Sequence, residues 1–274
     1  MLGGGVEPGA MTVIHGATGV GKTHFGLRFL GAGAGTDAQP GVIIDCTTRG
    51  DSQQHAEYAR RLCGWELGNG AVACEDIWSP RERGPDLFNG LDYSGKPVTR
   101  ANVSEDEWRV WEARLQQRLE DLNAFLYFHF VRGVRRVLID GIEPAERVED
   151  SVQLKLIEHT YQNVLRTDHD WVARNLFRGQ WMQQKDAVAA HAYDKDDIAT
   201  VILQTSHEVM LTDLMSRNVL DGDLATNANT VILLGRWPLG GKIARAAFVL
   251  KHRGRACSDE VVPFTITDDG LQAL

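Results

Sequence analysis

Eight residues near the start of the chain, GATGVGKT at positions 16–23, constrain the fold more than any other segment. They match the pattern G-x-x-x-x-G-K-[S/T], which occurs once in the chain. A short apolar run at 11–15 precedes them and a helical pattern at 24–30 follows. A strand, a glycine-rich loop and a helix in this order enclose phosphate groups with backbone amides and the amino end of the helix. A chance match in a chain with 28 glycines is the alternative, and the flanking elements disfavour it.

The loop predicts a nucleoside triphosphate and Mg²⁺ as cofactors, with ATP and GTP not distinguished. Lys22 is expected to reach the β- and γ-phosphates, and the Thr23 hydroxyl to ligate Mg²⁺. Asp140 ends the apolar run Val137-Leu138-Ile139, and an unpaired carboxylate inside such a buried run would be costly. We therefore interpret Asp140 as the second Mg²⁺-binding residue. The predicted nucleotide contacts are Gly16, Ala17, Thr18, Gly19, Val20, Gly21, Lys22, Thr23 and His24.

Short β-branched runs predict strands at 11–15, 41–46, 134–140, 199–204 and 230–234. Their continuous apolar character is typical of parallel strands covered on both faces, so we expect an α/β fold with helices on both sides of the sheet. Runs at 242–251 and 260–267, joined by a turn at 252–259, predict an antiparallel hairpin at the edge.

The remaining segments predict a long helix and two insertions. Ser104-Glu105-Asp106-Glu107 has the pattern of a capping box. Apolar residues then recur every three or four positions up to His129, with Gly133 marking the end, which indicates a helix packed on the core. Residues 77–103 are rich in glycine and proline and are expected to be loops. Residues 145–197 are mostly helical in pattern, with a break near 167–170. The amphipathic stretch RNLFRGQWMQQK at 174–185 is expected to form a structural helix, with binding of single-stranded nucleic acid as the alternative.

Composition narrows the classes of protein. The 274 residues are 43% hydrophobic, enough for one large α/β domain. A net charge of −8 gives no global attraction to nucleic acid or anionic lipid. The four cysteines form no zinc-binding pattern and are expected to be buried free thiols, as in a cytoplasmic protein. The sequence contains neither a signal-like segment nor an apolar run of membrane-spanning length, so we expect no membrane association.

The two ends of the chain resemble a known family. GGGVEPGAMTVIHGATGVGKT, at 3–23, resembles the opening of RecA-superfamily P-loop ATPase cores, closest to the KaiC and RadA branch. NTVILLGR at 229–236 and the segment at 244–271 are similar to the KaiC-like closing hairpin, with its Lys-x-Arg-Gly turn and its Phe-x-Ile-Thr-x-x-Gly end. The resemblance implies one RecA-like ATPase domain over 1–274, into which 77–103 and 145–197 are inserted. These two insertions match no pattern of the family.

The resemblance also implies roles for residues outside the loop. In this family the Lys-x-Arg turn reaches the γ-phosphate bound by a neighbouring subunit, so Lys251 and Arg253 are candidate catalytic residues acting across an interface. A solvated basic turn that includes Arg255 is the alternative. Ser206, in QTSHEV, occupies the place of the family's polar sensor residue. The alternative is that it only forms hydrogen bonds at the end of its strand. Cys257 stands where KaiC-like proteins have a histidine, which is a departure from the family site.

One further departure concerns catalysis. RecA-superfamily cores carry a glutamate shortly after the second strand, which polarises the attacking water. Here Thr47 or Thr48 holds that position, and a hydroxyl is not a competent base near neutral pH. Asp45, Asp51 and Glu143 are the nearby carboxylates, none at the family spacing. Hydrolysis is therefore expected to be slow.

Three functions follow from the resemblance. The first is a KaiC-like ATPase that self-associates, with a hexameric ring as one form, and acts on an unidentified protein partner. The second is a DNA-binding recombination or repair protein of the RecA/RadA kind, and the third is a DnaB-like helicase core. The segment after Ser206 carries Glu208, Asp213, Asp221 and Asp223 against only Arg217, and such a loop repels phosphates. The core also fills the whole sequence given, which leaves no room for the DNA-binding domain of RadA-like proteins. These observations rank the ATPase first.

Overall fold

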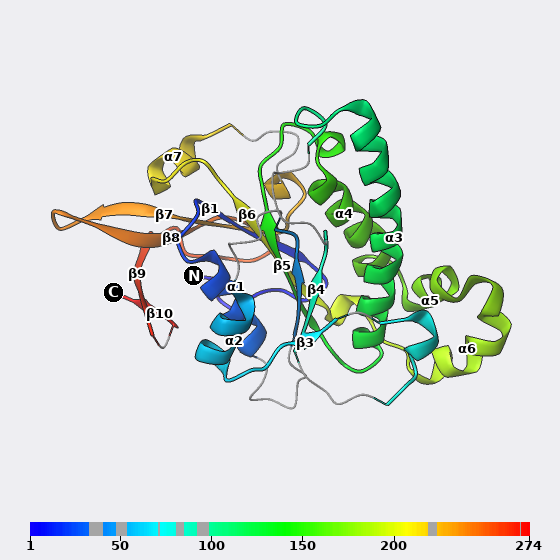
Figure 1. Cartoon of the computed structure of the whole chain (residues 1–274). Helices are drawn as coiled ribbons and strands as arrows, with labels where there is room; N and C mark the ends of the chain where they lie inside the picture. Colours follow the sequence, from blue (N-terminus) through cyan, green and yellow to red (C-terminus); the bar gives the residue numbers. More distant parts are fainter. Residues whose placement is uncertain are drawn as a thin grey trace.

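A single sheet of ten strands organises the described part of the computed structural model (Figure 1). The strand order is β10-β9-β8-β7-β1-β6-β5-β2-β4-β3. The structure describes residues 1–32, 41–47, 54–70, 72–80, 85–91, 99–218, 224–268 and 270–274. The parallel strands are β1 (Met11–Gly16), β2 (Val42–Asp45), β3 (Gly68–Asn69), β4 (Asp86–Asn89), β5 (Arg136–Ile142), β6 (Ala199–Thr205) and β7 (Thr230–Leu239). All five predicted parallel strands are confirmed.

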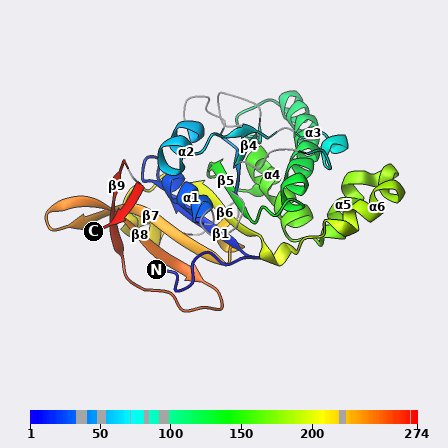
Figure 2. The ribbon, with the colours of Figure 1, turned by 90° about the horizontal axis from the view of Figure 1, so that it is seen from below.

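Helices cover both faces of the sheet, as predicted (Figures 1 and 2). On one face α1 (Lys22–Gly31) and α2 (His55–Cys63) pack against alternate strand residues such as Leu138. On the other face Val137 and Ile139 pack with α3 (Glu105–Phe130), α4 (Val152–Thr160) and α5 (His169–Phe177). Consecutive residues of β5 thus lie in two different apolar layers, which is why the strand is continuously apolar. This is a mixed α/β structure with a RecA-like arrangement.

Three strands at the carboxyl end of the chain are antiparallel: β8 (Lys242–His252), β9 (Val262–Thr267) and β10 (Gly270–Ala273). They confirm the expected antiparallel edge. The structure differs from the prediction in β7, which continues past residue 234 to Leu239 and joins β8 through Gly240 and Gly241. Both glycines have positive φ, 56° and 77°, the left-handed region that this tight turn requires. The resulting hairpin projects from the body of the molecule (Figure 1).

The predicted secondary structure of 77–103 is wrong in part, whereas that of 145–197 is largely confirmed. Residues 77–103 were expected to be loops, but β4 lies within them and pairs with β2. A strand of four residues is too short to show an alternating pattern, and it forms because Phe88 is buried against Phe125 of α3. Residues 145–197 are mostly helical, and the break at 166–168, before α5 begins at His169, overlaps the break expected near 167–170.

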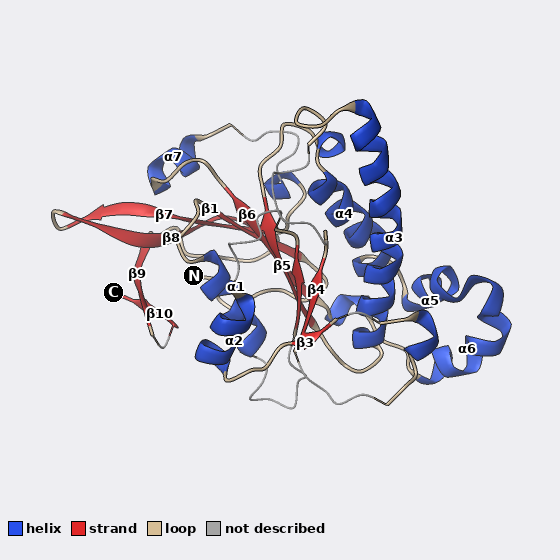
Figure 3. Cartoon of the chain, viewed as in Figure 1, coloured by secondary structure: helices blue, strands red, loops and turns tan. Residues whose placement is uncertain are grey.

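Residues 174–185 do not form the single amphipathic helix that was predicted. α5 ends at Phe177, a 3₁₀ turn covers Arg178–Gln180, and α6 (Trp181–Ala190) follows. Arg178 has φ 29°, which an α-helix cannot accommodate. The remaining elements are a π-helical turn at Tyr161–Leu165, the helix α7 (Leu211–Ser216), and 3₁₀ turns at Cys74–Asp76, Val148–Asp150, Lys195–Asp197 and Leu224–Thr226 (Figure 3).

The structure bears on two expectations from composition, the absence of membrane-spanning segments and the state of the cysteines. No described helix combines the length and apolar character needed to cross a membrane. All four cysteines are free thiols, but only Cys46 is buried, whereas Cys63, Cys74 and Cys257 are partly exposed.

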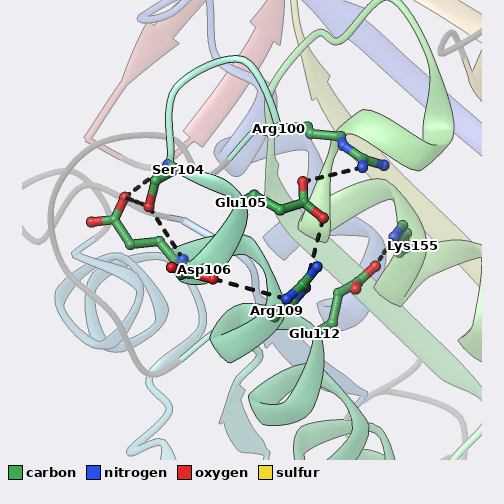
Figure 4. A network of polar contacts seen from close by, with 8 residues as sticks. Arg100, Ser104, Glu105, Asp106, Arg109, Glu112 and Lys155 are labelled. Atoms are coloured by element: carbon green, nitrogen blue, oxygen red, sulfur yellow. Dashed lines mark hydrogen bonds and ion pairs between the residues drawn. The ribbon is translucent and has the colours of Figure 1, made fainter.

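The amino end of α3 has the predicted capping box (Figure 4). The Glu107 amide donates to the Ser104 hydroxyl (3.3 Å), and the Ser104 amide donates to the Glu107 carboxylate (2.8 Å). Farther along, Glu112 accepts a hydrogen bond from Lys155 of α4 (2.7 Å), which ties the two helices together. Two orphan amides of a 26-residue helix are therefore satisfied by side chains.

Ser104→Ala should lower the free energy of unfolding by about 1 kcal/mol, because one amide at the start of α3 loses its acceptor. Urea unfolding followed by circular dichroism measures the change. Ser216→Ala is the control, since Ser216 lies at the end of α7 and donates only to carbonyls of its own helix. An equal loss in both variants would contradict a capping role for Ser104.

Candidate functional site

The glycine loop, residues 16–21, follows β1 and leads directly into α1. Gly19 and Gly21 have φ of 76° and 114°, a conformation that side chains other than glycine rarely adopt. At Gly16 an added Cβ would lie 2.2 Å from the carbonyl oxygen of Leu234 in β7. The glycines are therefore required by the path of the backbone, which turns sharply between the strand and the helix. Such a turn directs successive amides toward one side, where an anion can bind.

Lys22, the first residue of α1, folds back over this loop. Its Nζ donates to the carbonyl oxygens of Gly16 (2.8 Å) and Ala17 (3.0 Å), and the side chain is buried. Burial lowers the pKa of Lys22 to about 8, although the charge of Asp140 opposes this shift. The ammonium group thus lies at the loop, where it donates to two backbone carbonyls.

Thr23 and Asp140, the two predicted Mg²⁺ ligands, are in direct contact. The Thr23 hydroxyl donates to Asp140 Oδ2 at 2.9 Å, although 117 positions separate the two residues in the sequence. The amide of Gly141 donates to the other oxygen, Oδ1, at 2.7 Å. Mg²⁺ in phosphate sites takes one or two protein oxygens together with water and phosphate oxygens. A hydroxyl and a carboxylate that meet beside the glycine loop fit this requirement.

A third residue, His55, contacts Asp140 and was not predicted from the sequence. His55 begins α2 and is only 2% exposed. Its Nε2 lies 3.1 Å from Asp140 Oδ2, and its Nδ1 lies 3.4 Å from Asp45 Oδ2. Burial alone lowers the pKa of His55, but the hydrogen bonds and charges of the two carboxylates outweigh this and raise it to about 9. No local pattern marks His55, because the packing of α2 brings it to the site.

The region expected to hold a catalytic glutamate contains Asp45 instead. Thr47 follows β2, and its amide donates to Asp45 Oδ1 at 2.9 Å. Thr48 and Asp51 lie outside the described residues. Burial raises the pKa of Asp45, but its contacts with His55 and Thr47 outweigh this and lower it overall. Asp45 is therefore an ionised carboxylate beside Asp140.

Gln153 of α4 connects the ends of β2 and β5. Its Nε2 donates to the carbonyl oxygens of Cys46 (2.6 Å) and Gly141 (2.7 Å), and its Oε1 accepts from the Glu143 amide (3.1 Å). Gly141 has φ 89°, and a Cβ there would lie 2.5 Å from Thr47. A helix of the segment 145–197 thus fixes the backbone that carries Asp140.

Ser206 and His24 flank the glycine loop. The amide of Ser206, just after β6, donates to the carbonyl of Gly16 at 3.0 Å. Its hydroxyl donates to the carboxylate of Glu208, and this hydrogen bond lowers the pKa of Glu208. The His24 ring lies 5.2 Å from that of Tyr58 in α2. Ser206 therefore contacts the loop directly, through hydrogen bonding just after its strand, and its role as a sensor stays a prediction.

Lys251 and Arg253 do not lie near the glycine loop of their own chain. Thr12 of β1 pairs with Thr230 of β7, which pairs with His252 between the two cations. They are therefore beside the amino end of β1, about 13 Å along the strand from the loop at its carboxyl end. Lys251 Nζ donates to the carbonyls of Ala225 (3.1 Å) and Thr226 (3.2 Å). Within one chain, Lys22 and Ser206 lie at the carboxyl ends of the parallel strands, and Lys251 and Arg253 lie at their amino ends.

No protein-family model matches the chain. The chain is 25% identical over 271 residues to the circadian clock protein KaiC2 of Synechocystis sp., covering 99% of this chain and 37% of that protein. It is 24% identical over 275 residues to the circadian clock oscillator protein KaiC of Synechococcus elongatus, covering 98% of this chain and 41% of that protein. The chain thus spans about two fifths of these relatives. The similarity fits the RecA-like fold and loosely supports the KaiC-like branch.

The strand that leads into the loop predicts a specific pH dependence. His15 is buried in β1, and burial together with the charge of Arg217 lowers its pKa to about 4. The unfolded chain therefore binds more protons than the folded chain between pH 6.5 and 4, so stability falls as the pH falls through this range.

His15→Gln should reduce this acid sensitivity. Between pH 7 and pH 4 the difference in unfolding free energy between variant and wild type should move in favour of the variant, by up to about 3 kcal/mol. Urea unfolding at several pH values measures it, and His207→Gln, at an exposed histidine, is the control. Parallel stability curves for wild type and His15→Gln would contradict the assignment.

Proposed function

We propose that this chain is a Mg²⁺-dependent, KaiC-like ATP-binding protein that hydrolyses ATP slowly and works as a homo-oligomer. The observation that carries the proposal is the contact between Thr23 and Asp140 beside Lys22. A glycine loop alone is a common backbone feature. A loop whose lysine folds over it, and whose threonine contacts a carboxylate from a distant strand, fits a polyphosphate and its metal ion.

Each residue of the site has a distinct role in this proposal. The amides of the glycine loop bind the phosphate chain, and Lys22 exchanges its two carbonyl partners for phosphate oxygens. Thr23 and Asp140 would hold Mg²⁺, which when bound neutralises charge on the phosphates. The Ser206 amide donates to the Gly16 carbonyl, and this holds the Ser206 hydroxyl beside the loop, where β6 ends. These groups bind and orient the nucleotide, and none of them is a base for water.

The slow rate in the proposal rests on the residues that follow β2. Thr47 lies there, and its amide is held by Asp45. The Asp45 carboxylate itself lies 3.4 Å from Nδ1 of His55, so an acid with a histidine partner takes the place of a free carboxylate.

The oligomer in the proposal rests on the placement of Lys251 and Arg253. Two cations at the amino ends of the parallel strands cannot contact a nucleotide bound at the glycine loop of their own chain, which lies at the carboxyl ends. A neighbouring copy whose loop faces this edge would receive them at its γ-phosphate, where developing charge needs cations. A head-to-tail contact of this kind repeats and closes into a ring when the rotation permits.

Calorimetry with ATP and Mg²⁺ tests the nucleotide site. Wild type should bind, and Lys22→Ala should weaken binding at least about tenfold because a buried charge-assisted contact is lost. Lys185→Ala, at an exposed lysine of α6, is the matched control and should leave the affinity unchanged. GTP in place of ATP establishes the preference. An absence of heat with both nucleotides would overturn the proposal.

A mixing experiment tests the interface. Lys22→Ala keeps the Lys251 and Arg253 cations, and the double variant Lys251→Ala/Arg253→Ala keeps the loop. Each alone should lose ATP turnover at least about tenfold, whereas a mixture should recover part of it, since a cation pair from one copy completes the loop of another. Gel filtration with and without ATP and Mg²⁺ follows assembly. A protein that stays monomeric, or a mixture with no recovery, excludes the role across the interface.

A further inference from the structure

A pocket of about 480 Å³ opens between α3, the carboxyl end of α4 and α5. Its volume lies in the range of small-molecule sites. None of its lining residues belongs to the glycine loop or to the groups described around that loop. The pocket is therefore separate from the candidate nucleotide site.

Two polar side chains in the wall of this pocket carry buried atoms that lack a partner. Within the described part of the chain, neither Asn123 Oδ1 nor His159 Nε2 has a hydrogen-bond partner. Burial lowers the pKa of His159, so its ring is neutral near pH 7 and one ring nitrogen is an acceptor. Buried polar atoms without partners destabilise a fold, so each one calls for an explanation outside the packing of the chain itself.

The other polar groups of the wall offer mainly acceptors. Gln117 Nε2 donates to Asp121 Oδ1 at 3.2 Å, and Asn163 Nδ2 donates to the carbonyl of His159 at 3.0 Å. Both amides thus use a donor within the protein and keep their oxygens as acceptors. A ligand that presents several donors complements such a wall.

The charges of the wall are already compensated. Glu120 lies 3.7 Å from the guanidinium of Arg178, and Asp121 lies 3.4 Å from that of Arg118. The pocket therefore gives little advantage to an ionic ligand. The rest of the wall is partly apolar and includes Leu119, Ala124, Val172 and Leu176. A ring with hydroxyl groups at its edge and C–H groups on its faces matches both kinds of surface.

We propose that this pocket binds a small uncharged saccharide, whose hydroxyl groups donate to Asn123, to His159 and to the acceptors of the rim. Asn123 and His159 turn toward the bound ring and gain the partners that they lack. The backbone around the pocket is irregular, as at many binding sites: Asn163 lies in the π-helical turn, and Arg178 has φ 29°. The proposal does not depend on the proposed function, since the two sites share no residue.

A simpler role is that Asn123 and His159 only fill space between the helices. Gln184 of α6 provides a matched comparison, because its Oε1 accepts a hydrogen bond from Trp78 Nε1 at 2.8 Å. Replacing Gln184 by leucine removes a satisfied amide. Replacing Asn123 by leucine removes an oxygen that has no partner in the ligand-free protein.

Saturation-transfer NMR with glucose, maltose, trehalose and myo-inositol as probes tests the proposal. At least one probe should bind wild type with a dissociation constant of about 1 mM or lower. Asn123→Leu and, separately, His159→Leu should weaken that binding at least about tenfold, because a hydrogen bond to the ligand is lost. Gln184→Leu should keep the wild-type affinity.

Thermal unfolding without ligand separates binding from packing. Asn123→Leu should keep or raise the unfolding midpoint, because it removes an unsatisfied polar atom, whereas Gln184→Leu should lower it. If Asn123→Leu does not fold, or loses as much stability as Gln184→Leu, its role is structural and His159→Leu decides the binding site. Four probes that all fail to bind overturn the proposal, as does binding that His159→Leu leaves unchanged. Spermidine, tested beside the four probes, should not bind; binding of spermidine alone assigns the pocket to cations and overturns the proposal.

Discussion

The hydrogen bond between Thr23 and Asp140 is the contact on which the candidate site depends, and it requires α1 to lie very close to the sheet. β6 separates β1 from β5, so α1 must cross it to bring Thr23 to Asp140. Gly26 permits the crossing, because a Cβ there would lie 2.6 Å from the Leu138 side chain. The apolar run of β5 therefore has two functions, as buried surface for α1 and as the support that places the Asp140 carboxylate, two residues before the end of the strand, at the loop.

The parallel sheet separates two kinds of charge. The glycine loop, Asp45, Asp140 and Ser206 all lie at the carboxyl ends of the parallel strands. Because β8 runs antiparallel to β7, its last residues and the turn after it lie at the amino ends of the parallel strands. Lys251 and Arg253 are therefore at the opposite ends of the strands from the glycine loop. Anion-binding groups and the cations proposed to complete them thus cannot meet within one chain. This separation makes assembly a condition for activity in the proposed function.

The sequence predicted those features that local physics determines. The loop, its strand and its helix are contiguous, and a buried run that ends in one acid marks Asp140. Short strands escaped prediction, because β3 and β4 have only two and four residues, and β4 depends on the packing of Phe88 against Phe125 of α3. The extension of β7 was missed because its residues 235–239 are stabilised by the β8 partner rather than by burial. His55 was missed for a similar reason, since 85 positions separate it from Asp140.

The contact between Asp45 and His55 bears on why a threonine, and not a glutamate, follows β2. A free glutamate beside Asp140 would add a negative charge to a site that must release a charged product. Here the acid nearest along the chain, Asp45, lies on the strand itself and is compensated by His55, so its charge is directed at the protein and not at water. In the proposed function the consequence of this arrangement is slow turnover. In that proposal the nucleotide-bound state, rather than the hydrolysis rate, controls assembly with a neighbouring copy.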